Sequence, residues 1–333
     1  MLFYFLGIIL GAICVYYMVQ ITYTADYPMY ESYFKKEYEN TDFIFYKSAY
    51  YFRHHNLTFQ DLFGAHILVI SALYLLFISK FNSNFFYIFG VYLLLSFIPY
   101  VNQIRFYLAF PCFLLAAYYL LLNRKVMWFC LFGVLGGLSH SAILPLYSFF
   151  LFYLFVPEKF YKNILIFGSI ILFITSYIVS NTTLYAAFEH FGEYIKNENQ
   201  SSFLGGVFSM LPTLVILIPL YLLDKKYLGN RNLPTYKFLK KLSFYTVLLI
   251  PASTFIQIIG YRYVFPFLVV WIMFFLYLIK DKPLKVKIRH FFISYLLIIV
   301  VLYLQYILPL EVLGESSYLE EINETIKSIN IYR

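Results

Sequence analysis

Long uninterrupted apolar runs constrain this chain more than any other feature of its sequence. They recur along the 333 residues with lengths of about 17–25 residues, which an α-helix needs to cross a hydrocarbon core of about 30 Å. Only 13% of the residues are charged and 62% are hydrophobic, whereas a soluble domain carries about a quarter charged residues. A membrane β-barrel would instead show alternating segments of about ten residues. The sequence therefore predicts an all-α, polytopic membrane protein that forms a single integral-membrane domain over residues 1–333.

The apolar runs predict about eleven transmembrane helices. The first run, Met1 to Ile21, lacks a basic n-region and predicts a retained helix, not a cleaved signal peptide. The candidate spans are 1–21, 62–79, 84–100, 104–122, 126–139, 141–157, 164–180, 204–223, 241–259, 263–279 and 291–309. Three longer segments face outward in this count: a partly helical loop at 22–61, a loop at 181–203 and an amphipathic tail at 310–333.

The distribution of basic residues predicts the orientation. With the N-terminus in the cytoplasm, the cytoplasmic gaps hold 16 of the 25 Lys and Arg residues but only 3 of the 17 Asp and Glu residues. Basic residues concentrate in cytoplasmic loops of membrane proteins, so the pattern predicts a cytoplasmic N-terminus and an outer C-terminus. The formal net charge of +8 is then a signal of topology and not of nucleic-acid binding.

Two arginines depart from this rule. Arg105 and Arg262 each lie in a very short outer connection between two spans. Either could be an interfacial arginine whose head reaches the lipid headgroups. A guanidinium also binds phosphate oxygens in a bidentate manner, which favours a lipid phosphate or pyrophosphate as ligand. Their neighbours Gln103, Tyr261 and Tyr263 are then candidate substrate contacts.

His140 lies between two serines at an outer helix end. A single histidine can be a packing residue, a general base, a donor to a phosphate oxygen or a partner for a sugar hydroxyl. No other His or carboxylate stands three or four residues away, and Cys14, Cys112 and Cys130 lie in apolar runs without metal-ligand spacing. We therefore predict no metal and no cofactor.

Asp26 opens the first outer loop. Its position two residues before Pro28 suits a helix N-cap, but Tyr30 and Tyr33 share its helical face and together resemble a sugar-binding surface. Glu31 is a second acid nearby. The stretch from Asp42 to His55 is aromatic and basic at its end, as in a helix that lies in the membrane interface.

Several of these motifs occur in the order of a known family. They resemble the EpsG family, which belongs with the Wzy-type bacterial polysaccharide polymerases. The resemblance rests on D-x-x-x-Y (Asp26, Tyr30), I-R-F-Y-L-A (Arg105), the basic turn after it (Arg124, Lys125), S-H-S-A (His140) and Y-R-Y (Arg262). The very long outer loop of many O-antigen polymerases is missing.

The resemblance implies a GT-C-like fold and a metal-independent, inverting glycosyltransferase. Such an enzyme would join undecaprenyl-pyrophosphate-linked repeat units of an exopolysaccharide, capsule or O-antigen on the outer face of a bacterial cytoplasmic membrane. Its partners would be the lipid-linked glycan donor and acceptor and membrane lipid, with a chain-length regulator and a flippase as further candidates. No nucleic acid is expected.

One mechanism combines the residues with the resemblance. Arg105 and Arg262 would bind the donor pyrophosphate, and either Asp26 or His140 would orient or deprotonate the acceptor hydroxyl. Two other functions remain open. A membrane O-acyltransferase would open its site toward the cytoplasm, whereas a lipid-linked oligosaccharide flippase would show pseudo-repeats and broken helices, neither of which the sequence reveals.

Overall fold

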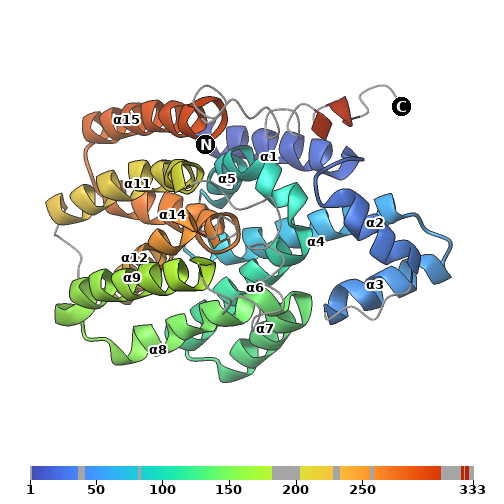
Figure 1. The fold of residues 1–333 in the computed structure, drawn as a ribbon. Coiled ribbons are helices and arrows are strands. Elements are labelled where there is room, and N and C mark those ends of the chain that lie inside the picture. Colours follow the sequence, from blue (N-terminus) through green and yellow to red (C-terminus); the bar gives the residue numbers. More distant parts are fainter. Residues whose placement is uncertain are drawn as a thin grey trace. The chain divides into compact units, whose positions relative to one another are not determined.

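The computed structural model is helical in every element that it describes (Figure 1). It describes residues 2–36, 42–81, 84–181, 203–227, 233–255, 259–308, 324–325 and 327–329, and these contain no strand. The chain forms two compact units, Met1–Phe150 with Ser317–Arg333 and Leu151–Ser316, which we describe separately. The predicted all-α class is confirmed.

Five helices in the described part of the chain are long and apolar enough to cross a membrane. They are Phe59–Ser79, Phe85–Asn102, Ile104–Leu121, Glu158–Val179 and Arg262–Ile279. The segments Tyr4–Gln20, Val126–Ser139 and Ser141–Phe155 are apolar but shorter. The protein is thus a multi-pass membrane protein by length and composition, and the count of about eleven spans stays a prediction.

The first unit is built around one buried helix. Its elements are α1 (Leu2–Gln20), α2 (Tyr27–Lys36), α3 (Phe43–His54), α4 (Phe59–Ser79), α5 (Phe85–Asn102), α6 (Ile104–Leu121), α7 (Val126–Ser139) and the 3-10 helix η1 (Ser141–Tyr147), which leads into α8 (Ser148–Phe155). Helix α6 packs against α4 and α7, while α1 packs against α5 and α4. A Cβ on Gly7 would lie 2.3 Å from the backbone nitrogen of Tyr87, so the α1–α5 contact requires glycine there.

The two ends of α6 carry different chemistry. Its 18 residues span about 27 Å. Near the C-terminal end of α6 the ring centres of Tyr118 and Phe81 lie 5.3 Å apart. The turn that contains Lys80 therefore lies near this end of α6, which Arg124 follows closely in the chain. Arg105 lies at the N-terminal end and shares a contact with His140. Both residues therefore lie at the same end of the first unit; that this end faces outward stays a prediction.

The segment predicted to be a partly helical first outer loop contains α2 and α3, which are held against the ends of the long helices; that it faces outward stays a prediction. At the start of α2 the Tyr27 N–H donates to Oγ1 of Thr24 at 3.1 Å. The Tyr27 hydroxyl donates to Oε1 of Gln60 at 2.6 Å, and Nε2 of Gln60 donates to the carbonyl oxygen of Val19 at 2.6 Å. These bonds join α2 to α4 and to the end of α1.

The tail returns to the same region. The hydroxyl of Thr22 donates to the Ser328 carbonyl oxygen at 3.2 Å. This bond brings the described part of the tail next to the end of α1. The predicted loop at 181–203 and most of the predicted tail lie outside the described residues.

The second unit contains interrupted helices. Its elements are α9 (Glu158–Asn181), α11 (Phe203–Lys226), α12 (Pro234–Tyr245), η4 (Thr246–Leu248), η5 (Pro251–Thr254), η6 (Gly260–Val264), η7 (Phe265–Phe267), α14 (Leu268–Ile279), α15 (Leu284–Leu302) and η8 (Tyr303–Ile307). The predicted continuous span at 241–259 is wrong, because α12 ends at Tyr245 and short 3-10 turns follow.

Local hydrogen bonds explain that interruption. Hydroxyls of Thr246, Ser253 and Thr254 donate to carbonyl oxygens three residues earlier at 2.6–2.8 Å, and such bonds compete with the α-helical pattern. Pro251 also removes a backbone donor. Likewise the predicted span at 141–157 begins as a 3-10 helix that contains Pro145. Both segments are thus interrupted helices, a feature that the sequence did not reveal.

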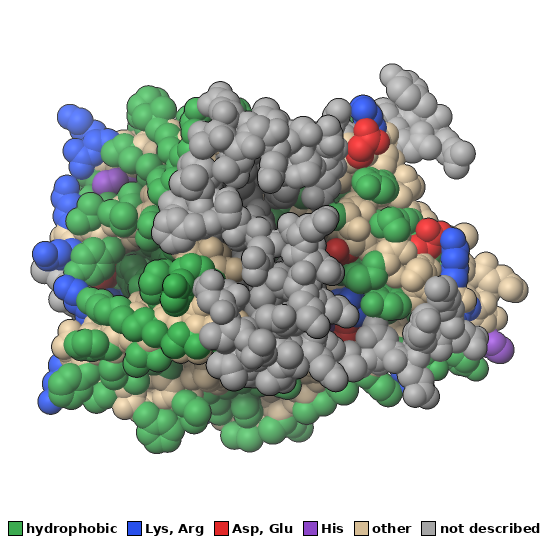
Figure 2. All heavy atoms as spheres, viewed as in Figure 1, with side chains coloured by type: hydrophobic (Ala, Val, Ile, Leu, Met, Phe, Trp, Pro, Cys, Tyr) green, Lys and Arg blue, Asp and Glu red, His purple; other side chains and the backbone are tan. Residues whose placement is uncertain are grey.

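Basic side chains gather at one end of the second unit, over α9, α11 and α15 (Figure 2). Lys237 lies 3.5 Å from Glu158, and Nζ of Lys282 lies 4.5 Å from the ring centre of Tyr227. The described residues of the gaps at 158–163, 224–240 and 280–290 therefore lie at the same end, which supports the premise of the orientation count. That this end is cytoplasmic stays a prediction.

Candidate active site

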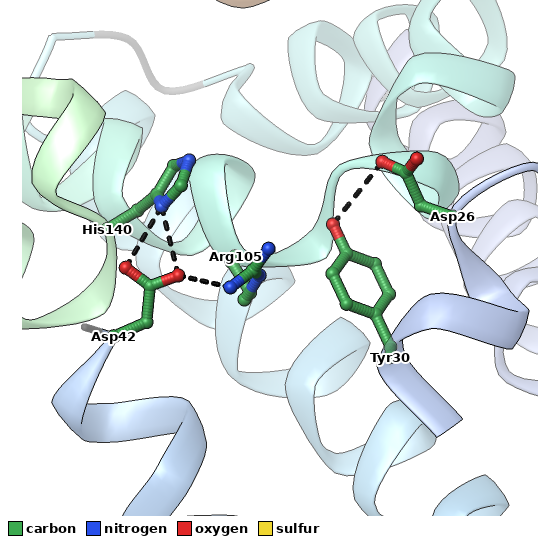
Figure 3. A network of polar contacts seen from close by, with 5 residues as sticks. All are labelled: Asp26, Tyr30, Asp42, Arg105 and His140. Atoms are coloured by element: carbon green, nitrogen blue, oxygen red, sulfur yellow. Dashed lines mark hydrogen bonds and ion pairs between the residues drawn. The ribbon is translucent and has the colours of Figure 1, made fainter. Parts of the chain in front are cut away.

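Three helix ends of the first unit converge on one carboxylate (Figure 3). Asp42 immediately precedes α3, Arg105 is the second residue of α6, and His140 joins α7 to η1. The Asp42 oxygens lie 3.0 and 3.1 Å from Nδ1 of His140, and Oδ2 also forms an ion pair with Nη1 of Arg105. The side chains of Asp42, Arg105 and His140 are 1%, 11% and 14% exposed, so water is largely excluded from the cluster.

Local backbone geometry positions these side chains. His140 has extended backbone angles, φ −163° and ψ 119°, which end α7 and turn the imidazole away from the helix. Its ring meets Phe106 edge to face at 6.0 Å. Asp42 occupies the N-cap position of α3 but makes no side-chain capping bond. Its carboxylate therefore contacts His140 and Arg105 and does not cap α3.

The cluster stabilises the ionised form of Asp42. Burial alone would raise the pKa of this carboxyl, but the hydrogen bond from His140, the charge of His140 when it is protonated, the charge of Arg105 and the Ser141 N–H hold its pKa below the ordinary 3.8. An anionic Asp42 accepts a hydrogen bond from Nδ1–H of His140. We assign the tautomer from this contact. A neutral imidazole then carries its lone pair on Nε2 and is set up to accept a proton there.

Aromatic rings surround the guanidinium of Arg105. Its Cζ lies 5.0 Å from the ring centre of Tyr30, 5.4 Å from Tyr33 and 5.8 Å from Phe45. Contacts of this kind are worth about 0.5–2 kcal/mol each when desolvated. The predicted contacts Tyr30 and Tyr33 thus lie beside the predicted phosphate ligand Arg105.

Asp26 lies on the other side of Tyr30 from Asp42 (Figure 3). The Tyr30 hydroxyl donates to Oδ2 of Asp26 over a long 3.5 Å, and the Asp26 backbone N–H donates to Oδ1 of Asn102 at 2.8 Å. Glu31 forms a 2.6 Å salt bridge with Lys35 on the solvent side of α2. Asp26 therefore borders the cluster through Tyr30, whereas Glu31 is engaged elsewhere.

Two buried polar atoms near the cluster have no hydrogen-bond partner among the described residues. They are Nε of Arg105 and Oε1 of Gln103. Most buried polar atoms in proteins are paired, and these two belong to residues at the same short turn between α5 and α6. One is a donor and the other an acceptor, so together they suit a ligand that carries both an anionic oxygen and a hydroxyl.

The remaining predicted residues lie in the second unit. Arg262 lies in a π-helical turn, Gly260–Val264, at the start of a candidate span. Tyr261 belongs to the same turn, and Tyr263 is 6% exposed. Such π-turns are frequent at functional sites. The pairing of Arg262 with Arg105 stays a prediction.

Sequence reasoning missed Asp42. It lies 63 residues from Arg105 and 98 from His140, so no local spacing connects them. From the sequence it is named only as the first residue of an aromatic stretch that resembles a helix lying in the membrane interface. The available signal was a carboxylate next to that helix, in the loop that follows the first span.

The donor set of the cluster suits an anion better than a metal ion. It offers one imidazole and one carboxylate, and the guanidinium beside them would repel a cation. Among the residues that the structure describes, no group of three His, Cys, Asp or Glu side chains is placed to hold a metal.

The apolar helical spans define a multi-pass membrane protein, and its first unit carries a buried Asp–His–Arg cluster. A family model matches residues 2–317, and the chain belongs to the EpsG family. This is a family of Wzy-type polysaccharide polymerase-like membrane proteins, so the predicted resemblance is confirmed. Membership implies, at a general level, a glycosyltransferase-like polymerase of polysaccharide biosynthesis. Comparisons with curated proteins and with solved structures gave no match.

Proposed function

We propose that the protein is a polysaccharide polymerase that joins undecaprenyl-pyrophosphate-linked repeat units by inverting glycosyl transfer on the outer face of the cytoplasmic membrane. The observation that supports this most directly is the Asp42 carboxylate, which contacts both His140 and Arg105. The cluster joins a proton acceptor to a guanidinium in one largely buried site. Family membership supplies the general activity.

In an inverting transfer, the acceptor hydroxyl attacks the anomeric carbon as the bond to the leaving pyrophosphate breaks. The proton of that hydroxyl passes to Nε2 of His140, and Asp42 stabilises the resulting imidazolium through Nδ1–H. The bonding electron pair leaves with the pyrophosphate. General base catalysis of this kind contributes about 10²–10⁴-fold in rate. Of the two bases left open by the sequence, we favour His140 because it contacts a buried anion.

Arg105 stabilises the negative charge that develops on the pyrophosphate as it leaves. One terminal nitrogen bonds Asp42, while Nε is buried without a partner among the described residues. The aromatic rings hold the guanidinium in place, so little reorganisation is needed when the substrate binds. One well-placed donor to a developing oxyanion is worth about 10²–10³-fold in rate. Arg262 would supply a second such contact, in place of the charge that a metal would bring.

The bilayer would hold the polyprenyl chains of donor and acceptor. Side chains on the outer surface of α9 are large and apolar; they include Phe167, which is 66% exposed, and Ile171, which is 62% exposed. Such a surface suits lipid. A flippase that delivers the repeat units and a chain-length regulator are the partners that this reaction calls for.

A lipid-linked oligosaccharide flippase is the second candidate function. It is favoured by the interrupted helices at 246–267, because transporters bind substrates at such breaks. The two functions differ in what their loss leaves behind. Without a polymerase, single lipid-linked repeat units accumulate on the outer face, whereas without a flippase they remain inside.

The test complements a strain that lacks this gene with wild type, Arg105→Ala, His140→Gln and Arg262→Ala. We expect each variant to lower polymer output about 10²–10³-fold at normal protein levels, with single repeat units exposed outside. Lys125→Ala is the control and should retain polymer output, because it removes a positive charge that lies beyond the C-terminal end of α6, away from Arg105. Normal polymer from both arginine variants would disprove the mechanism, and repeat units trapped inside would favour the flippase.

A further inference from the structure

Helix α3 presents an exposed aromatic face beside the candidate active site. Phe43, Tyr50 and Tyr51 are 48%, 53% and 56% exposed, and Lys47 and His54 are exposed along the same helical face. The opposite face carries the buried Phe45 and Ala49. We call the exposed residues Phe43, Lys47, Tyr50, Tyr51 and His54 the α3 stripe.

The rings of the stripe are ordered by their neighbours. Tyr50 and His54 are nearly parallel, at 7° and 6.1 Å between ring centres. Tyr51 lies 4.1 Å from His55. Nζ of Lys47 lies 5.5 Å from the ring centre of Phe43. Flat apolar faces thus alternate with hydroxyl, imidazole and ammonium groups along the helix.

This composition differs from that of the exposed surface of α7 in the same unit. On α7 the exposed large side chains are mostly aliphatic and include Val126, Leu131 and Val134, whereas α1 exposes Leu6, Ile9 and Ile13 together with Phe5 and Tyr16. The α3 stripe contains no aliphatic side chain. A surface of rings with polar tips suits a ligand that has apolar patches and many hydroxyls, which is the chemistry of a carbohydrate.

The stripe is continuous with the site. Asp42 precedes Phe43 directly, so the stripe begins one residue from the carboxylate that contacts His140 and Arg105. The helix has 12 residues and extends about 18 Å from that point. An oligosaccharide that leaves the site along α3 would therefore pass over this face.

We propose that the α3 stripe binds the oligosaccharide portion of the polymerase substrate and holds the growing glycan next to the Asp42 cluster. The inference rests on the proposed function, since it assumes a glycan substrate. The other occupant that such a face could have is the lipid headgroup region, and the experiment separates the two.

The experiment measures binding of delipidated, size-fractionated polysaccharide from the producing strain to the full-length protein in nanodiscs of neutral lipid. The double variant Tyr50→Ala, Tyr51→Ala should bind about tenfold more weakly than wild type, because it loses two ring contacts. In cells it should shift the polymer toward shorter chains. Tyr16→Ala, which removes a 61% exposed tyrosine from α1, is the matched control and should change neither result.

Unchanged affinity and chain length in the double variant would overturn the inference. A second measurement tests the lipid alternative: strong quenching of a Tyr50→Trp variant by brominated lipids, relative to wild type, would place the stripe in the bilayer and also overturn it. The proposed function fails differently, since wild-type protein would then make no polymer. Polymer from wild type together with an unaffected double variant refutes the α3 stripe alone.

Discussion

Replacing Asp42 with Asn tests the cluster most directly. The substitution keeps the shape of the side chain but removes the charge that His140 and Arg105 share. Asp42 is 1% exposed, so water cannot take over its contacts. The amide can accept one hydrogen bond, but it leaves the guanidinium without its buried counter-charge.

The structure sets the size of the expected effect. Breaking a buried ion pair by removing one partner costs about 3–5 kcal/mol. Tyr30 and Tyr33 remain 5.0 and 5.4 Å from the guanidinium and offset part of the loss, so we expect destabilisation of about 3 kcal/mol. The rate should fall about 10²–10⁴-fold, because the imidazolium formed on His140 is no longer stabilised.

The assay combines thermal unfolding of the purified protein with polymer output at matched protein level. Asp61→Asn is the matched control: it removes an exposed carboxylate that caps α4 with Thr58, which should cost about 1 kcal/mol and leave polymer output intact. If Asp42→Asn made normal polymer at a normal level, neither the base role of His140 nor the ion pair with Arg105 would matter for function.

Two further predictions concern pH and helix packing. The pKa of Asp42 is lowered, so its stabilising contribution is complete above its ordinary value of 3.8 and is lost only as the pH falls further. The difference in unfolding free energy between wild type and Asp42→Asn should therefore not shrink from neutral pH down to about pH 4, because protonation of His140 beside the anionic Asp42 favours wild type, and it should shrink below that pH; shrinkage already at pH 6 would contradict the assignment. Gly7→Ala should destabilise the protein by about 1–3 kcal/mol, because the new Cβ would meet the Tyr87 backbone at 2.3 Å. In thermal unfolding, Gly133→Ala is the control, since its Cβ would meet no atom within 4 Å, and an equal loss in both would rule out packing as the cause.

The spans that the sequence predicted best are those with a single strong signal. The runs predicted at 62–79, 84–100 and 104–122 correspond to α4, α5 and α6 within a few residues. A long apolar run must be helical in a bilayer, because every backbone N–H and carbonyl needs a partner there. Hydropathy could not show the break after Tyr245, because that break depends on where individual hydroxyls donate.

The candidate site was predictable in part. Arg105 and His140 stood out because each is an isolated ionisable residue in a very short connection between two apolar runs, and the arginine lies on the predicted outer side, against the positive-inside trend. The structure places both in contact with Asp42. The choice between Asp26 and His140 as base could not be made from the sequence. It depends on which carboxylate contacts the imidazole, and that carboxylate was neither predicted nor near in sequence.

Apolar run length and residue type were enough to determine the helical membrane class, the family and two of the three residues in the cluster, because hydropathy and short motifs are local properties of a chain. The tertiary structure alone decided that Asp42 is their shared partner and that Tyr30 and Tyr33 surround Arg105. Those contacts arise where α3, α6 and α7 meet. Residues 63 and 98 positions apart come together there only through packing of the helices, which no local pattern in the sequence records.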